Sequence, residues 1–90
     1  TGVSMVFFHA SWCSICKAQR PFVKEAANLE SLNDVFFGQV EFEDHSDITS
    51  ERSVSGFPTT IIYKDGVEQT RLNGKGHDTD KLETLLKTYL

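Results

Sequence analysis

The hydrophobic pattern of the chain changes its period at Cys13, and this change limits the folds that the sequence can adopt. Val3 to His9 is a short apolar run of β-prone residues, long enough for a buried strand and too short for a helix. From Cys13 on, polar residues such as Gln19 and Arg20 separate apolar residues that recur at helical spacing: Ile15, Ala18, Phe22, Ala26 and Leu29. Pro21 lies inside this run and is expected to kink the helix without ending it. A strand followed by such a helix predicts the start of a β-α-β unit.

The rest of the chain supplies three more expected strands. They are predicted at Val35–Glu43, Thr60–Tyr63 and Val67–Leu72. Val40 and Phe42 are the clearest buried positions of the first of these strands. The polar residues between the first two strands are expected to hold a short helix at most.

Turn and cap signals indicate the topology. Lys64-Asp65-Gly66 is a hairpin turn, which makes the last two strands antiparallel. Asp78 is a good N-cap for a final amphipathic helix. No repeat or linker interrupts the chain, so we expect a single domain over residues 1–90. The predicted fold class is α/β, with a mixed four-stranded sheet and helices on both of its faces.

Composition narrows the function classes. The 90 residues are 39% hydrophobic and 24% charged, which is typical of a small globular domain. The net charge of −4 offers no basic patch for nucleic acid and no polybasic segment for anionic lipid. No apolar run approaches the roughly 20 residues that cross a bilayer. We therefore expect neither a nucleic-acid partner nor a membrane span.

The two cysteines, Cys13 and Cys16, are predicted to be a reactive pair. A disulfide between them would close a loop too small to stabilise the fold usefully. Cys13 lies where the strand ends and the helix begins, and the N–H groups and dipole of a helix N-terminus favour a thiolate there. Cys16 lies one turn further along, where it can attack a mixed disulfide formed at Cys13.

Other interpretations of these residues remain open at this stage. A Cys-x-x-Cys pair can be half of a zinc site, with the other ligands drawn from His9, His45 and His77. No second Cys-x-x-Cys or His-x-x-x-His pair exists, so we expect no metal and no cofactor. We expect His9 to be structural rather than a catalytic base. Trp12 fits either a core position or a surface position beside the cysteines.

Several motifs resemble those of the thioredoxin family, and the resemblance covers nearly the whole chain. The segment Phe8–Lys17 resembles the family's active-site segment, and Pro21 matches its helix-kinking proline. Gly56-Phe57-Pro58-Thr59 resembles the loop whose cis-proline faces the cysteines. Lys64-Asp65-Gly66 matches the family's hairpin, and Gly74 matches its glycine beside the active site.

The resemblance implies a thioredoxin fold and thiol–disulfide exchange with protein substrates. Cys13 would be the nucleophile and Cys16 the resolving thiol. A shallow docking surface for an extended substrate segment would be formed by Trp12, Phe57, Pro58 and Gly74. The surroundings of the cysteines resemble those of a reductase more than those of an oxidase or isomerase. A non-catalytic binding or adaptor module of the same fold is the alternative, although such a module needs neither cysteine.

The resemblance also implies partners. A monomer that exchanges disulfides with proteins needs a recycling reductase or oxidase. The sequence specifies no compartment, because both cysteines belong to the motif and no further bridge indicates an oxidising space. The cytoplasm is slightly favoured over a periplasm-like or secretory compartment.

The chain departs from the family pattern in three places. Only about a dozen residues precede Cys13, so the family's extra N-terminal strand and helix are absent from these residues. The dipeptide between the cysteines is Ser14-Ile15 rather than Gly-Pro or Gly-His. Phe7 and Gln39 occupy the positions of the family's buried carboxylate and its lysine partner. The carboxylate and its lysine partner are absent together, as expected, because burying either charge without the other is costly. Water, or less readily Glu41, would then take the proton of Cys16.

Overall fold

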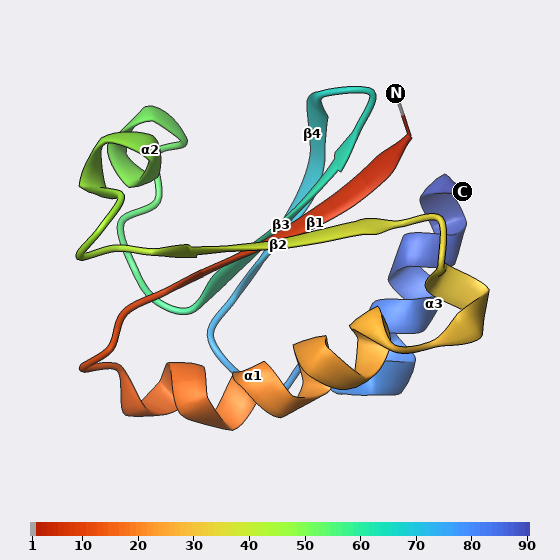
Figure 1. Ribbon diagram of the computed structural model, residues 1–90, viewed down its shortest axis with the longest axis horizontal. Coiled ribbons are helices and arrows are strands. Elements are labelled where there is room, and N and C mark those ends of the chain that lie inside the picture. Colours follow the sequence, from red (N-terminus) through yellow and green to blue (C-terminus); the bar gives the residue numbers. More distant parts are fainter. Residues whose placement is uncertain (1) are drawn as a thin grey trace.

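The computed structural model describes residues 2–90. In chain order its elements are β1 (Val3–His9), α1 (Ser14–Ala27), the 3-10 helix η1 (Glu30–Leu32), β2 (Phe36–Glu41), α2 (Ser46–Glu51), β3 (Thr59–Lys64), β4 (Val67–Asn73) and α3 (Thr79–Tyr89) (Figure 1). Each strand predicted from the sequence is present, and the predicted short helix is α2.

The four strands form one mixed sheet in the order β2-β1-β3-β4. β1 pairs with β2 in parallel, while the β1–β3 and β3–β4 pairs are antiparallel. Asp65 and Gly66 both have positive φ, at 53° and 83°, as a tight hairpin turn between β3 and β4 requires. The predicted sheet and its mixed pairing are confirmed.

Helices cover both faces of the sheet. Figure 1 shows α1 and α3 on one side and α2 on the other. Val3 and Met5 of β1 pack with Ala26 of α1 and Leu82 of α3 in one apolar cluster. Phe8 of β1 faces the opposite way and packs in a second cluster. Because side chains alternate along a strand, the face that carries Met5 also carries Phe7 and His9 toward α1.

Ala26 is buried and Phe22 packs against the core as predicted, but in the first two turns of α1 the buried face lies one residue away from the predicted one. Ile15 is 45% exposed, whereas Cys16 and Gln19 are fully buried. Gln19 tolerates burial because its amide bonds the main chain of His77 on both sides. Its Nε2 donates to the carbonyl oxygen at 2.7 Å, and its Oε1 accepts from the N–H at 3.2 Å. The sequence pattern missed this face because it assigned the polar Gln19 to the solvent side.

β2 is shorter and more exposed than predicted. It spans Phe36–Glu41 rather than the predicted Val35–Glu43, because a turn follows in which the Asp44 N–H donates to the Glu41 carbonyl at 3.1 Å. Val40 and Phe42 are only half-buried. The reason is that β2 is an edge strand, with β1 on one side only.

Candidate active site

Cys13 is positioned by the turn that joins β1 to α1. Its N–H donates to the Ala10 carbonyl at 3.1 Å, which closes the turn. Cys13 is also the N-cap of α1, in an extended conformation with φ −92° and ψ 105°. Its Sγ accepts a hydrogen bond from the Cys16 N–H at 3.1 Å. A sulfur that receives such a bond at a helix N-terminus is in the setting that favours a thiolate.

Cys13 and Cys16 form a disulfide, and they differ in burial. Their Cα atoms lie 5.3 Å apart, within the usual range for disulfides. Cys16 is fully enclosed, whereas Cys13 keeps 7% of its surface exposed. Both pack in an apolar cluster with Phe7 and Ala10, bordered by Phe42, Phe57 and Val23. Only Cys13 is therefore within reach of a molecule outside the protein.

Aromatic side chains form a rim beside the cysteines. Trp12 is 67% exposed, which excludes the core position considered for it. Its ring meets the edge of the Phe57 ring, with centroids 5.9 Å apart. The Phe57 ring also packs against the Phe42 ring, with centroids 5.3 Å apart. The rim joins the loop before Cys13, the loop before β3 and the segment just after β2.

The loop before β3 closes the other side of the site. The Phe57–Pro58 peptide bond is cis. The Thr59 hydroxyl donates to the Gly56 carbonyl at 2.7 Å, and the Pro58 carbonyl accepts from the Gly74 N–H at 2.9 Å. Gly74 has a φ of 77°, in the region that favours glycine. The four predicted docking residues are thus joined in two pairs, Trp12 with Phe57 and Pro58 with Gly74.

The positions of the family's missing charges lie side by side on neighbouring strands. Phe7 is the register partner of Gln39 in the β1–β2 pair. Phe7 is 1% exposed and belongs to the same cluster as Cys16, whereas Gln39 is exposed. Of the hydrogen bonds among residues 2–90, none joins Glu41 to a cysteine. The inner side of Cys16 is therefore apolar.

A polar pair that the sequence did not predict, His9 and Arg20, adjoins Phe7, which packs with the cysteines. His9 is 5% exposed, and its ring stacks on Phe7 with centroids 5.4 Å apart. Arg20 Nη2 donates to His9 Nδ1 at 3.1 Å. Burial lowers the pKa of His9, the positive charge of Arg20 lowers it further, and Glu41 and Glu43 oppose the shift. The expectation that His9 is structural is consistent with this contact, but the role of Arg20 was missed.

Glu43 fixes the turn before Cys13. Its carboxylate accepts from the Ser11 N–H at 3.0 and 3.2 Å and also from the Ser11 hydroxyl. These bonds lower the pKa of Glu43, with the hydroxyl of Ser11 as the main cause. The loop that carries Trp12 and Cys13 is thereby tied to the segment after β2.

Within residues 2–90 no three His, Cys, Asp or Glu side chains gather as a metal site would require. In the same part of the chain no helix has the length and hydropathy to cross a membrane.

A cysteine pair that closes to a disulfide at the start of a helix, with one cysteine slightly exposed and the other fully enclosed, is suited to one chemistry. The cysteine nearer the surface can exchange with an outside disulfide, and the enclosed one can complete the exchange. On this fold, the pair defines a thiol–disulfide oxidoreductase.

The chain belongs to the thioredoxin family, whose model, described as Thioredoxin, matches residues 1–88. It is 36% identical over 89 residues to a thioredoxin of Chlamydia caviae, covering 99% of this chain and 84% of that protein. It is 35% identical over 81 residues to a protein disulfide-isomerase of Schizosaccharomyces pombe, but these are 88% of this chain and only 22% of the isomerase. The structure of a thioredoxin variant from Halobacterium salinarum superposes with a TM-score of 0.86 at 26% identity, over 99% of this chain and 75% of that one.

Proposed function

We propose that this chain reduces disulfides of protein substrates, with Cys13 as nucleophile and Cys16 as resolving thiol. The observation that carries the proposal is the difference between the two sulfurs. Cys13 Sγ accepts the Cys16 N–H at the helix start, and Cys13 as a residue retains a little exposed surface, whereas Cys16 is enclosed. The order of attack follows from this difference, because a substrate can reach only the first sulfur.

The reaction has two steps. In the first, the Cys13 thiolate attacks one sulfur of the substrate disulfide, a mixed disulfide forms, and the other substrate sulfur leaves as a thiolate that takes a proton from water. In the second, the Cys16 thiol gives up its proton and its sulfur attacks Cys13 Sγ. The second substrate thiolate then leaves and is protonated. The substrate gains two electrons and two protons, and the chain is left as the Cys13–Cys16 disulfide.

The rim around Cys13 supports docking of an extended substrate segment. Trp12 and Phe57 offer exposed or half-buried aromatic surface, and the loop at Pro58 lies against Gly74 at the end of β4. An extended segment can pair with main-chain groups at such a loop, in the manner of β-strand addition. We assign substrate docking to Trp12, Phe57, Pro58 and Gly74.

Sequence similarity to known proteins favours reduction over oxidation or isomerisation. The Chlamydia caviae relative named thioredoxin is matched over most of its length, whereas the isomerase is matched over a small part. A reductase must be returned to its dithiol form by a partner that supplies electrons. We infer a recycling reductase as one partner, disulfide-containing proteins as the others, and a monomer as the working form.

Insulin reduction in the presence of dithiothreitol tests the proposal. The wild-type protein should accelerate the precipitation of the insulin B chain, and Cys13→Ser should abolish the acceleration. Ser14→Ala is the matched control, because Ser14 is exposed and lies between the cysteines without taking part in either step. A wild-type protein that gives no acceleration would support the adaptor alternative. A redox potential in the range of protein disulfide isomerases would support isomerisation.

A further inference from the structure

We propose that His9 and Arg20 are a positioning pair for the second step, in which neutral His9 holds the Arg20 guanidinium near the buried end of the cysteine pair. There the positive charge of Arg20 favours the thiolate that Cys16 must become. The proposal deepens the proposed function and rests on it, since it concerns how the mixed disulfide is resolved.

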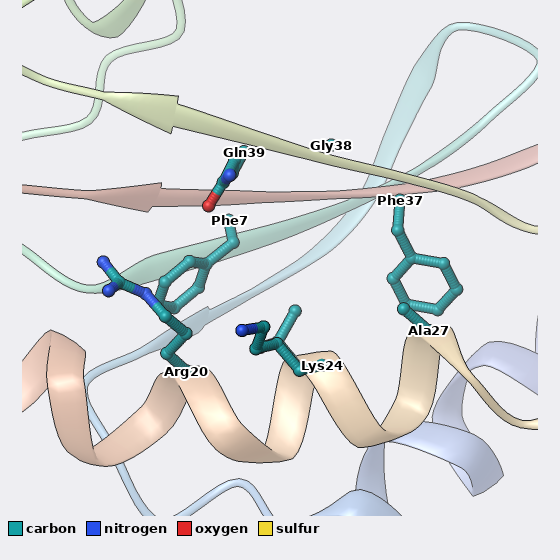
Figure 2. Close-up of a pocket in the computed structure, with 8 residues that line it drawn as sticks. Phe7, Arg20, Lys24, Ala27, Phe37, Gly38 and Gln39 are labelled. Carbon is teal, nitrogen blue, oxygen red and sulfur yellow. The ribbon is translucent and has the colours of Figure 1, made fainter.

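The placement of Arg20 follows from helix geometry. Arg20 comes four residues after Cys16 in α1, so the two side chains are neighbours on one face of the helix. Long side chains in a helix lean toward its N-terminus, which turns the Arg20 stem toward Cys16. Figure 2 shows Arg20 extending from α1 toward Phe7 on β1. Phe7 stacks on His9 and packs in the cluster of Cys16, so it adjoins both the polar pair and the resolving cysteine.

Cys16 needs a compensating charge because its surroundings are apolar. Burial in such surroundings disfavours a thiolate, and a cation nearby offsets that penalty. No carboxylate stands at position 7 to accept the proton, since Phe7 fills that place. Arg20 forms no ion pair among residues 2–90, and its buried Nε has no hydrogen-bond partner there. The charge of Arg20 is therefore not neutralised by a carboxylate and can act on Cys16.

The contact between His9 and Arg20 requires the neutral imidazole. A guanidinium can only donate, so His9 Nδ1 must accept and the ring proton must be on Nε2. The charged groups that face His9 are Arg20 from α1, Glu41 as its register partner in β2, and Glu43 after β2. Burial and Arg20 lower the pKa of His9, which keeps the ring neutral at neutral pH.

Protonation of His9 would release Arg20. Both ring nitrogens then carry protons, the acceptor is lost, and two cations face each other. A cavity of about 340 Å³ gives Arg20 room to move away, because Arg20 lines it together with Phe7, Lys24 and Gln39 (Figure 2). The second step should thus slow in acid beyond the effect of the cysteine's own proton.

Ellman's disulfide separates the two steps in a single experiment. The reduced protein is mixed with one equivalent of the reagent. Attack by Cys13 releases one coloured thiolate and leaves the other bound to Cys13 as a mixed disulfide. Attack by the deprotonated Cys16 on Cys13 Sγ then releases the second. Both phases are followed by stopped-flow absorbance between mildly acidic and neutral pH.

Arg20→Met, which keeps the apolar stem, should slow the second phase about tenfold at neutral pH and leave the first unchanged. His9→Gln offers a carbonyl acceptor that does not titrate. It should keep the neutral-pH rate of the second phase and show a shallower fall in acid than the wild type. Lys24→Met and His45→Gln are the matched controls. They remove a cation one turn beyond Arg20 and an exposed histidine, and both should behave as wild type.

A second phase that is unchanged in Arg20→Met would overturn the proposal. So would a His9→Gln profile that follows the wild type through the acid range. Should His9→Gln fail to fold by circular dichroism, the Arg20→Met result alone decides. The proposed function would fail separately, through the absence of a fast first phase in the wild-type protein.

Discussion

The stability of the oxidised protein should fall as the pH drops below the ordinary pKa of histidine, and His9 should be the cause. Burial and the charge of Arg20 hold the pKa of His9 below 6.5 in the folded protein. The unfolded chain therefore binds a proton at His9 at pH values at which the folded protein does not. Stability contributed by neutral His9 is complete above pH 6.5, and it is lost as the pH falls through the folded-state pKa.

One proton limits the size of this effect. The unfolded state binds at most one more proton at His9 than the folded state does. The free energy of unfolding should therefore fall by no more than about 1.4 kcal/mol per pH unit. Three carboxyl groups with lowered pKa values, Glu43, Glu68 and Glu83, act in a lower window, because their ordinary value is 4.5. A fall between pH 6.5 and about 5 thus reports on His9.

Urea unfolding at a series of pH values measures the effect. The disulfide form is used, so that neither cysteine titrates. His9→Gln should remove the dependence between pH 6.5 and about 5, and His45→Gln should keep it. A wild-type curve that is flat in this interval would refute the reasoning, as would a His9→Gln curve with the wild-type slope.

Four further predictions concern the cysteines, the proline loop and the last helix. Cys16→Ser should accumulate mixed disulfides with substrate proteins on non-reducing gels, and Cys13→Ser almost none; equal trapping by both would refute the assigned order of attack. Iodoacetamide at mildly acidic pH should label Cys13 of the reduced protein first, which peptide mapping would show, whereas preferential labelling of Cys16 would contradict the proposed thiolate. Pro58→Ala removes a buried ring, so it should slow insulin reduction and lower the free energy of unfolding by about 1–3 kcal/mol; unchanged rates would separate Pro58 from the reaction. Asp78→Ala removes the side chain that accepts the Lys81 N–H at 2.9 Å, so urea unfolding should show a loss of about 1 kcal/mol, with activity retained.

The features that the sequence predicted well are those with local causes. The hairpin follows from Asp65-Gly66, whose residues tolerate positive φ, and the last helix begins where Asp78 can cap it. The strands β1 and β3 follow from short apolar runs whose neighbours in the chain mark their ends. The cysteine pair also has a local signal, because its spacing places Cys16 in the first turn of a helix that Cys13 caps.

The features that the sequence missed depend on contacts between distant residues. Ser11 and Glu43 are 32 positions apart, and Gln19 meets the main chain of His77 from 58 positions away. A hydropathy pattern counts Gln19 as exposed, since nothing near it in the sequence announces a partner. Arg20 was likewise assigned to the solvent side of α1. The packing of β1 against α1 brings His9 Nδ1 within 3.1 Å of Arg20 Nη2.

Phe7 and Arg20 both affect the second step, the deprotonation of Cys16 and its attack on Cys13. Phe7 replaces the proton acceptor, and Arg20 provides a positive charge. A buried carboxylate beside Cys16 can take its proton and becomes a neutral acid next to the thiolate that remains. Phe7 removes this proton acceptor, so that deprotonation of Cys16 depends on water reaching the sulfur and on what stabilises the charge left behind. Arg20 supplies that stabilisation without a buried anion, and neutral His9 keeps it in place without neutralising it. In the proposed mechanism, the position of the Arg20 cation controls the second step. With a buried carboxylate at position 7, transfer of a proton to that carboxylate would control it instead.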